Sequence, residues 1–210
     1  MRKYWPLLKR LALAAAVAGS MPLHAQGAMS QAEHNEIRDF LQKTIAESSS
    51  FRDRFDAEVW LVSQSSALER YIETPQERLA LLKAIHREAS QAGINPDIVL
   101  AVIQIESGFN RYAISRVGAQ GLMQVMPFWK DEIGRPDDNL THIETNLTYG
   151  CHILQYYINK EKGKGGLAMA LARYNGSYPK YGYAEKVMNA WKNRWDTGTY
   201  LTSAESSSSR

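Results

Sequence analysis

The chain has 210 residues, of which 44% are hydrophobic and 22% charged, a composition typical of a globular protein and not of a disordered one. Its formal net charge of +3 comes from the first 25 residues, which carry four basic side chains and no acidic one, so the remainder carries −1. Nucleic-acid binding needs a clustered basic surface, and we therefore expect no nucleic acid as a partner.

Residues 1–25 have the pattern of a secretory signal peptide. A basic segment ends at Arg10, nine apolar residues follow at 11–19, and Ala25 is a small residue at a plausible cleavage point. The alternative, a membrane anchor, is disfavoured because a spanning helix needs about 20 apolar residues. No cysteine near the cleavage point offers a site for a lipid. We expect an exported, soluble protein that begins near Gln26, has no membrane anchor, and acts in the periplasm or outside the cell.

Apolar residues at helical spacing predict helices through most of the remaining chain. Residues 26–74 contain three such sets, one of which includes Val59, Leu61 and Val62, and we expect a helical N-terminal segment that packs on the core. A main domain is expected at 75–198, and residues 199–210 are expected to be a disordered tail. Because no run alternates as a strand would, the predicted fold class is mainly α.

Two helix starts have specific signals. Thr74-Pro75-Gln76-Glu77 combines a capping box with proline at the first helical position, and this helix is expected to stop at Gly93. Asn95-Pro96-Asp97 starts another helix, which runs through a nearly unbroken apolar stretch and ends near Gly108. Later helices are expected at about 147–160, 167–174 and 183–195.

Cysteine and histidine usage argues against redox and metal chemistry. The only cysteine, Cys151, lies on an apolar helical stripe, which excludes an internal disulfide and favours buried packing over nucleophilic chemistry. The five histidines show no metal-ligand spacing. We expect no metal and no cofactor.

One carboxylate is a candidate general acid. Glu106 ends the apolar helix and shares a helix face with Val99, Val102 and Ile103. Burial among aliphatic side chains and the negative end of the helix dipole both favour the neutral acid and raise its pKa. A general acid needs such a pKa at neutral pH. The alternative is an ordinary glutamate at a helix end whose side chain reaches solvent.

A short polar loop with two glycines follows this helix. Gly118 and Gly121 permit positive φ and a close approach of the backbone to a ligand. Gln124 offers an amide donor and an amide acceptor, which suit recognition of another amide such as an acetamido group. As a bare pattern, the loop is equally compatible with a structural turn in which Gln124 caps a helix.

Aromatic residues gather near the C-terminus. Tyr174 and Tyr183 lie at loop–helix junctions, where their ring faces and hydroxyls suit a sugar ring. Trp191 and Trp195 are four residues apart, and for these two we favour packing of the last helix into the core.

Taken in order, these segments resemble the SLT-type lytic transglycosylases of bacterial cell-wall turnover. The matching segments are Ile105-Glu-Ser-Gly-Phe-Asn110, Ser115, Gly118-Ala-Gln-Gly-Leu-Met-Gln124, Met126-Pro127, Ala170-Leu-Ala-Arg-Tyr-Asn-Gly-Ser177 and Tyr183-Ala-Glu-Lys-Val187. The resemblance covers about 77–195. The chain departs from the family in its Tyr-Asn-Gly-Ser third motif and in having Pro179-Lys180 where many relatives have Glu-Thr.

The resemblance implies a lysozyme-like domain (goose-type lysozyme/SLT) and peptidoglycan glycan strands as the partner. It implies that Glu106 is the catalytic acid and then base. The implied substrate-binding residues are Ser115, Gln124, Met126, Tyr174, Asn175 and Tyr183.

The implied reaction uses one carboxylate, whereas ordinary glycosidases use two. Glu106 would protonate the glycosidic oxygen between MurNAc and GlcNAc, and the 6-hydroxyl of the sugar would then close a 1,6-anhydro ring without consuming water. Two alternatives are a lysozyme-type hydrolase and a non-catalytic peptidoglycan-binding module. A third is an enzyme that opens the wall for a cell-envelope machinery, although nothing in residues 26–74 identifies such a partner.

Overall fold

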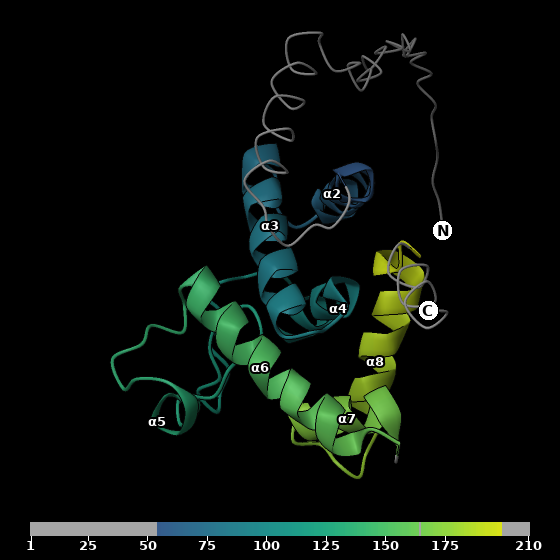
Figure 1. Ribbon diagram of the computed structural model, residues 1–210. Helices are drawn as coiled ribbons and strands as arrows, with labels where there is room; N and C mark the ends of the chain where they lie inside the picture. Colours follow the sequence, from purple (N-terminus) through teal and green to yellow (C-terminus); the bar gives the residue numbers. More distant parts are fainter. Residues whose placement is uncertain (1–53, 164, 199–210) are drawn as a thin grey trace, which may run out of the picture.

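A computed structural model describes residues 54–163 and 165–198, and within these ranges the chain consists of helices joined by turns (Figure 1). The elements are α2 (Arg54–Leu68), α3 (Pro75–Gln91), α4 (Pro96–Glu106), α5 (Trp129–Ile133), α6 (Ile143–Glu161), α7 (Gly166–Tyr174), α8 (Gly182–Ala190) and a π-helical turn, η1 (Trp191–Trp195). The predicted mainly α class is confirmed. The predicted signal peptide (1–25) and tail (199–210) lie outside the described residues. None of the helices described is long and apolar enough to cross a membrane.

The first described helix, α2, buries only part of the apolar set predicted for it. Leu61 of that set is buried, whereas Val59 and Val62 are 46% and 52% exposed and Trp60, outside the set, is buried. The large indole gains more from burial than a valine does, and its N–H donates to the Asp97 carboxylate at 2.7 Å. This helix of the predicted segment 26–74 therefore shares one hydrophobic core with the helices that follow.

Helices α3 and α4 begin where the capping signals predict. The Asn95 side chain accepts a hydrogen bond from the Asp97 backbone N–H at 2.8 Å, so it caps α4 as expected. The predicted capping box of α3 is wrong in detail. The Thr74 hydroxyl donates to the Glu77 carboxylate at 2.7 Å, and neither side chain caps the helix backbone.

The later helices differ from the prediction at their ends. α6 starts four residues before the predicted 147, and the five-residue α5 was not predicted, because so short a helix shows no periodicity. The single helix predicted at 183–195 is α8 followed by η1. Trp195 is fully buried, as predicted, and donates its indole N–H to the Gln104 side chain at 2.8 Å; Trp191 is half-buried. Cys151 is buried, also as predicted.

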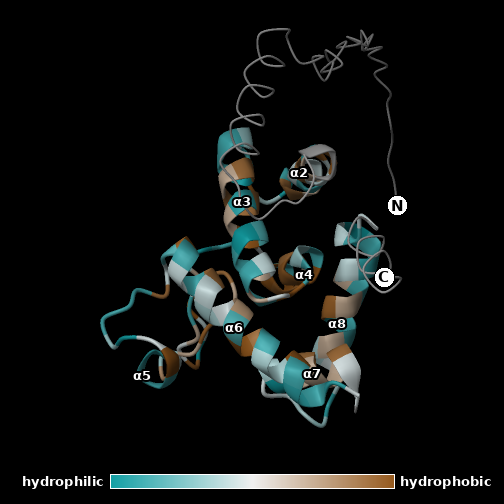
Figure 2. Cartoon of the chain, viewed as in Figure 1, coloured by the Kyte–Doolittle hydropathy of each residue, from teal (hydrophilic) through white to brown (hydrophobic). Residues whose placement is uncertain are grey.

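Helix α4 is the centre of the fold and positions the candidate acid. It packs against α3, α8 and η1, and it is among the most hydrophobic elements in Figure 2. Its first turn is tied down through the buried Asp97, which accepts hydrogen bonds from Trp60 and Gln64 of α2 and from Thr197. Since α4 is buried almost to its last turn, its final residue, Glu106, lies at the edge of the core.

Candidate active site

Glu106 has the environment that the sequence predicts for it. It is half-buried, and Val99, Val102 and Ile103 on the preceding turns are fully buried. Burial raises the pKa of Glu106, while hydrogen bonds from Tyr183 and Asn175 favour the carboxylate and partly oppose this rise. The effect of burial is larger than that of the hydrogen bonds, so the pKa of Glu106 is raised and its neutral form is favoured more than in water. Within the part of the chain that the structure describes, no second carboxylate contributes to this pKa.

Tyrosines from two helices surround the acid. The Tyr183 hydroxyl, at the start of α8, donates to Oε1 of Glu106 at 2.6 Å. The Tyr174 hydroxyl, at the end of α7, donates to the backbone carbonyl of Met123 at 2.8 Å. Burial, and next the negative charge of Glu106, raise the pKa of both phenols well above the usual value. Both hydroxyls therefore stay protonated and act as hydrogen-bond donors near neutral pH.

The loop after α4 is compact and internally hydrogen-bonded. Gln120 pairs with Ile114 and with Val125 in isolated β-bridges, and the Gln120 and Val125 backbones exchange two hydrogen bonds of 2.9 Å. Its tight turns require positive φ at Gly118 (+89°) and Gly121 (+77°). The Ser107 hydroxyl donates to the Leu122 carbonyl at 2.8 Å, which fixes the loop to the end of α4.

Gln124 is turned into this loop. Its amide nitrogen donates to the backbone carbonyls of Ala113 (3.1 Å) and Gly121 (3.0 Å), and its backbone adopts a left-handed φ of +49°. Both amide hydrogens thus serve the loop, which agrees with the structural-turn alternative, although Gln124 does not cap a helix. Its side-chain oxygen is the atom that can still accept a hydrogen bond from a ligand.

Ser115 and Met126 lie at the two ends of the loop. The Ser115 side-chain oxygen accepts a hydrogen bond from the Ala119 backbone N–H at 3.0 Å, so its hydroxyl hydrogen can point elsewhere. Met126 is half-buried. Among the described residues, Tyr183 and Asn175 interact directly with Glu106, whereas no hydrogen bond joins Ser115 or Gln124 to it.

Asn146 of α6 fixes the loop against the core, and sequence reasoning did not single it out. Its side-chain oxygen accepts a hydrogen bond from the Met123 backbone N–H at 2.7 Å. Its side-chain nitrogen donates to the carbonyls of Gln120 and Leu140, both at 2.8 Å. Asn146 is buried, so these bonds are shielded from water. It therefore sets the position of the Met123 carbonyl that Tyr174 binds.

Two glycines make this close packing possible. A Cβ at Gly121 would overlap the Asn146 side chain, and a Cβ at Gly150 of α6 would overlap Met123. Asn146 and Gly150 are one helical turn apart, a spacing that places both on the side of α6 facing the loop. The four-residue spacing of Asn146 and Gly150 is visible in the sequence, but only the structure shows that the loop packs against them.

The residues described here contain no group of three His, Cys, Asp or Glu side chains placed to hold a metal ion. The groups gathered around Glu106 are instead phenol, amide and backbone donors and acceptors. Such an arrangement supports proton transfer by one carboxyl group in a partly desolvated setting.

The chain is similar to known proteins of one family. Residues 83–194 match the family model for the transglycosylase SLT domain. Proteins named membrane-bound lytic murein transglycosylase C are similar to the chain. The one from Haemophilus influenzae (strain PittGG) is 48% identical over 133 residues, covering 57% of this chain and 36% of the relative. The one from Yersinia pestis (strain Pestoides F) is 31% identical over 129 residues, covering 54% and 35%.

A shorter match is to the protein of the same name from Actinobacillus pleuropneumoniae (serotype 3), 44% identical over 46 residues, or 22% of this chain and 13% of the relative. The matches therefore span between 13% and 36% of these relatives' own lengths.

Proposed function

The chain belongs to the transglycosylase SLT family, and from this premise we propose that it is a lytic transglycosylase acting on the glycan strands of peptidoglycan. The observation that carries the proposal is Glu106 itself: a half-buried carboxyl group of raised pKa at the end of a buried helix, hydrogen-bonded to a phenol. The relatives named above are murein transglycosylases by name, which supports the same substrate.

In the first step, neutral Glu106 donates its proton to the glycosidic oxygen between MurNAc and GlcNAc. The bond from that oxygen to the anomeric carbon breaks, and GlcNAc leaves with the proton. The substrate's N-acetyl group stabilises the positive charge that develops at the anomeric carbon. The Tyr183 hydroxyl, 2.6 Å from Oε1, stabilises the carboxylate that Glu106 has become.

In the second step, the Glu106 carboxylate accepts the proton of the MurNAc 6-hydroxyl. The 6-oxygen attacks the anomeric carbon and closes a 1,6-anhydro ring, so the acid is restored and no water is consumed. Because the nucleophile belongs to the substrate, no second protein carboxylate is required, and a well-oriented intramolecular attack has a large effective concentration.

The remaining predicted site residues have supporting roles in this proposal. Asn175 hydrogen-bonds to Glu106, and Tyr174 holds the Met123 carbonyl and hence the loop. The Gln124 side-chain oxygen accepts a hydrogen bond from the N-acetylated glycan, and the Ser115 hydroxyl donates one to it. Met126 lies along the same strand as an apolar contact.

We extend the proposal to organisation and location. Residues 75–198 form the catalytic domain, the helical segment 26–74 packs on it, and the signal peptide at 1–25 directs export to the envelope, where peptidoglycan lies. The relatives are membrane-bound by name, and for this chain we propose a mature protein in the periplasm or outside the cell.

The test is the solubilisation of purified peptidoglycan by the Glu106→Gln variant. The amide keeps the size of the side chain and can accept the Tyr183 hydrogen bond, but it has no acidic proton. We expect the rate to fall by about 10³-fold, within the range general acid catalysis contributes. Glu144→Gln, in the exposed first turn of α6, is the matched control and should retain the parent rate. A Glu106→Gln variant that solubilises peptidoglycan nearly as fast as the parent would remove the basis of the proposal.

A further inference from the structure

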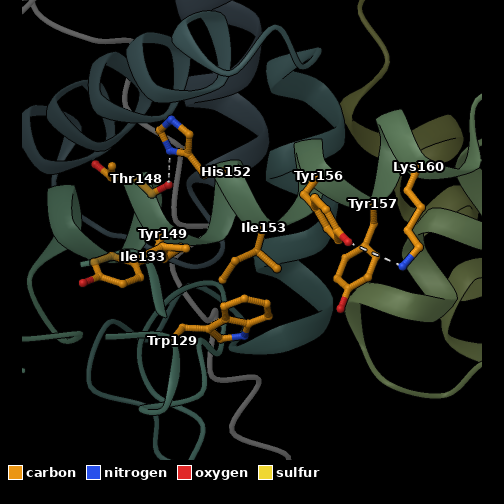
Figure 3. Close-up of a pocket in the computed structure, with 9 residues that line it drawn as sticks. All are labelled: Trp129, Ile133, Thr148, Tyr149, His152, Ile153, Tyr156, Tyr157 and Lys160. Atoms are coloured by element: carbon orange, nitrogen blue, oxygen red, sulfur yellow. Dashed lines mark hydrogen bonds between the residues drawn. The ribbon is translucent and has the colours of Figure 1, made fainter. Parts of the chain in front are cut away.

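A cavity of about 580 Å³ lies between α5 and α6, outside the site just described (Figure 3). Its α6 wall includes Tyr149, Ile153, Tyr156 and Lys160, which recur three and four residues apart along one face of the helix. The fully buried Leu147, Cys151 and Leu154 occupy the other face of α6. None of the proposed catalytic or substrate-binding residues lines this cavity. It is therefore a second concave surface with its own set of residues.

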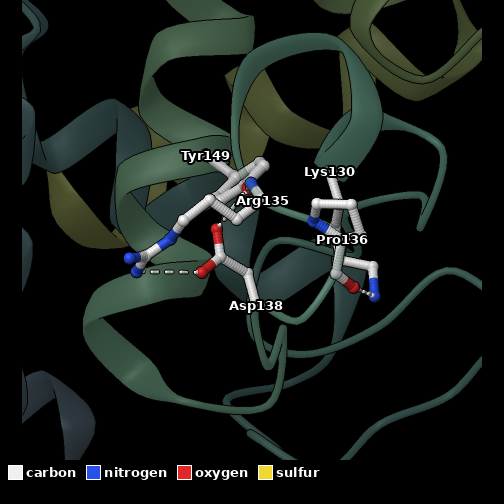
Figure 4. A network of polar contacts seen from close by, with 5 residues as sticks. All are labelled: Lys130, Arg135, Pro136, Asp138 and Tyr149. Atoms are coloured by element: carbon white, nitrogen blue, oxygen red, sulfur yellow. Dashed lines mark hydrogen bonds and ion pairs between the residues drawn. The ribbon is translucent and has the colours of Figure 1, made fainter.

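The wall of the cavity is held in place by a polar network (Figure 4). The Tyr149 hydroxyl donates to Asp138 at 2.6 Å and accepts from the Arg135 backbone N–H at 3.2 Å. The Lys130 ammonium donates to the Pro136 carbonyl at 2.6 Å, across the end of α5. A Cβ at Gly134 would overlap the Tyr149 hydroxyl, so the chain approaches α6 as closely as glycine allows. The cavity is thus preformed.

The side chains in the cavity are aromatic with polar tips. Trp129 of α5 faces α6, and the Tyr156 and Tyr157 rings stand edge to face with centroids 5.2 Å apart. Tyr156 is 55% exposed, and its hydroxyl accepts a hydrogen bond from the Lys160 ammonium at 3.5 Å. Flat apolar faces next to hydroxyl and indole groups match pyranose rings, which present C–H faces and hydroxyls.

Lys160 is the only Lys, Arg, Asp or Glu among the described residues that line the cavity, and its ammonium lies 5.4 Å from the Tyr156 ring centroid. The carboxylates of Asp138 and Glu88 accept hydrogen bonds from Tyr149 and Thr148, which lie about three helical turns away along α6. The Lys160 end of the cavity therefore favours an anionic group over a cationic one. Peptidoglycan combines both features, because its N-acetylhexosamine strand carries peptide stems that end in carboxylates.

We propose that the α5–α6 cavity is an accessory binding site for a peptidoglycan strand. A sugar ring stacks on Tyr156 beside Trp129, and a stem carboxylate pairs with Lys160. The inference rests on the proposed substrate but concerns a different surface. Its role is to hold the insoluble polymer while a neighbouring stretch of strand occupies the catalytic site.

The test is co-sedimentation of the full chain with purified sacculi in a Glu106→Gln background, so that binding is measured without turnover. Adding Tyr156→Ala should raise the dissociation constant by about five- to tenfold, the range expected from loss of one aromatic contact. Val62→Ala is the matched control, since Val62 on α2 is 52% exposed and lies in another element. Its binding should equal that of the background, and circular dichroism should show the same helix content in all variants.

Two further measurements test the Lys160 contact and separate the accessory site from the proposed catalytic function. Lys160→Gln should weaken binding to sacculi and leave binding to neutral chitin oligomers unchanged; an equal loss on both would overturn the carboxylate assignment. Unchanged sedimentation of the Tyr156→Ala variant, or the same loss in the Val62→Ala control, would overturn the accessory site. With Glu106 intact, Tyr156→Ala should cleave short soluble glycan fragments at the parent rate. If the parent itself yields no cleavage while binding still depends on Tyr156, the proposed function fails and the binding site stands.

Discussion

Replacing Asn146 by alanine should both destabilise the fold and reduce activity. The change removes three short hydrogen bonds, one accepted from the Met123 N–H and two donated to the Gln120 and Leu140 carbonyls. A buried polar group left without a partner costs about 1–3 kcal/mol, so three such groups cost about 3–6 kcal/mol after some relaxation. Domains of this size have a free energy of unfolding of about 5–15 kcal/mol, so the loss is a large fraction of the total.

Urea unfolding followed by circular dichroism measures this loss. With an m-value of about 2 kcal/mol/M, the midpoint should fall by about 2 M. Asn159→Ala is the control, because Asn159 is exposed on the same helix and its replacement should change the free energy of unfolding by less than about 0.5 kcal/mol. Asn146→Asp keeps an acceptor for Met123 but turns an oxygen towards the Gln120 and Leu140 carbonyls, and it should also be destabilised.

Catalysis should suffer in the folded fraction of Asn146→Ala as well, because the Met123 carbonyl that orients Tyr174 is no longer fixed. If the Asn146→Ala midpoint matches that of Asn159→Ala, the loop is held by other contacts and the reasoning from these three bonds is wrong.

Three other changes test the acid and its surroundings. Tyr183→Phe removes a hydrogen bond that favours the Glu106 carboxylate, so the pKa of Glu106 rises; the high-pH limb of the rate profile should move to higher pH, whereas Tyr181→Phe leaves it in place. Glu106→Gln should be at least as stable as the parent at pH 7. The folded-state pKa of Glu106 lies above 4.5, so its ionisation is less favourable in the folded state than in the unfolded state and destabilises the parent. Urea titrations should show that the higher free energy of unfolding of the variant disappears below pH 4.5, where Glu106 is neutral in both states. Gln124→Ala loses the bonds to Ala113 and Gly121, so both stability and kcat should fall, and a change in KM alone would return Gln124 to a purely ligand-binding role.

Sequence reasoning succeeded where structure is set by neighbours along the chain. The apolar run that ends at Glu106 and the Asn95 cap lie within a few residues of each other, so the buried helix and its terminal acid could be predicted. The hydrogen bond between Tyr183 and Glu106 spans 77 residues, and Tyr183 was assigned to the site by resemblance to a family rather than by periodicity.

Prediction from the sequence failed where contacts between segments distant in the chain determine the position of a side chain. The Asn146 bonds reach 6, 23 and 26 residues away, and no local pattern reveals them. On α2, the indole of Trp60 is buried because Asp97, 37 residues away, accepts its hydrogen bond, and the valines that periodicity favoured are exposed instead. The direction of the Gln124 amide depends on the positive φ values of the loop, which glycine permits but does not dictate.

The most direct measurement is mass spectrometry of the fragments released when the chain, expressed from Gln26 onward, digests purified peptidoglycan. The single-carboxylate mechanism at Glu106 predicts 1,6-anhydroMurNAc ends, lighter by one water than reducing ends, and predicts that they vanish in Glu106→Gln. Reducing MurNAc ends would contradict it, because water would then be the nucleophile and the protein would be a lysozyme-type hydrolase.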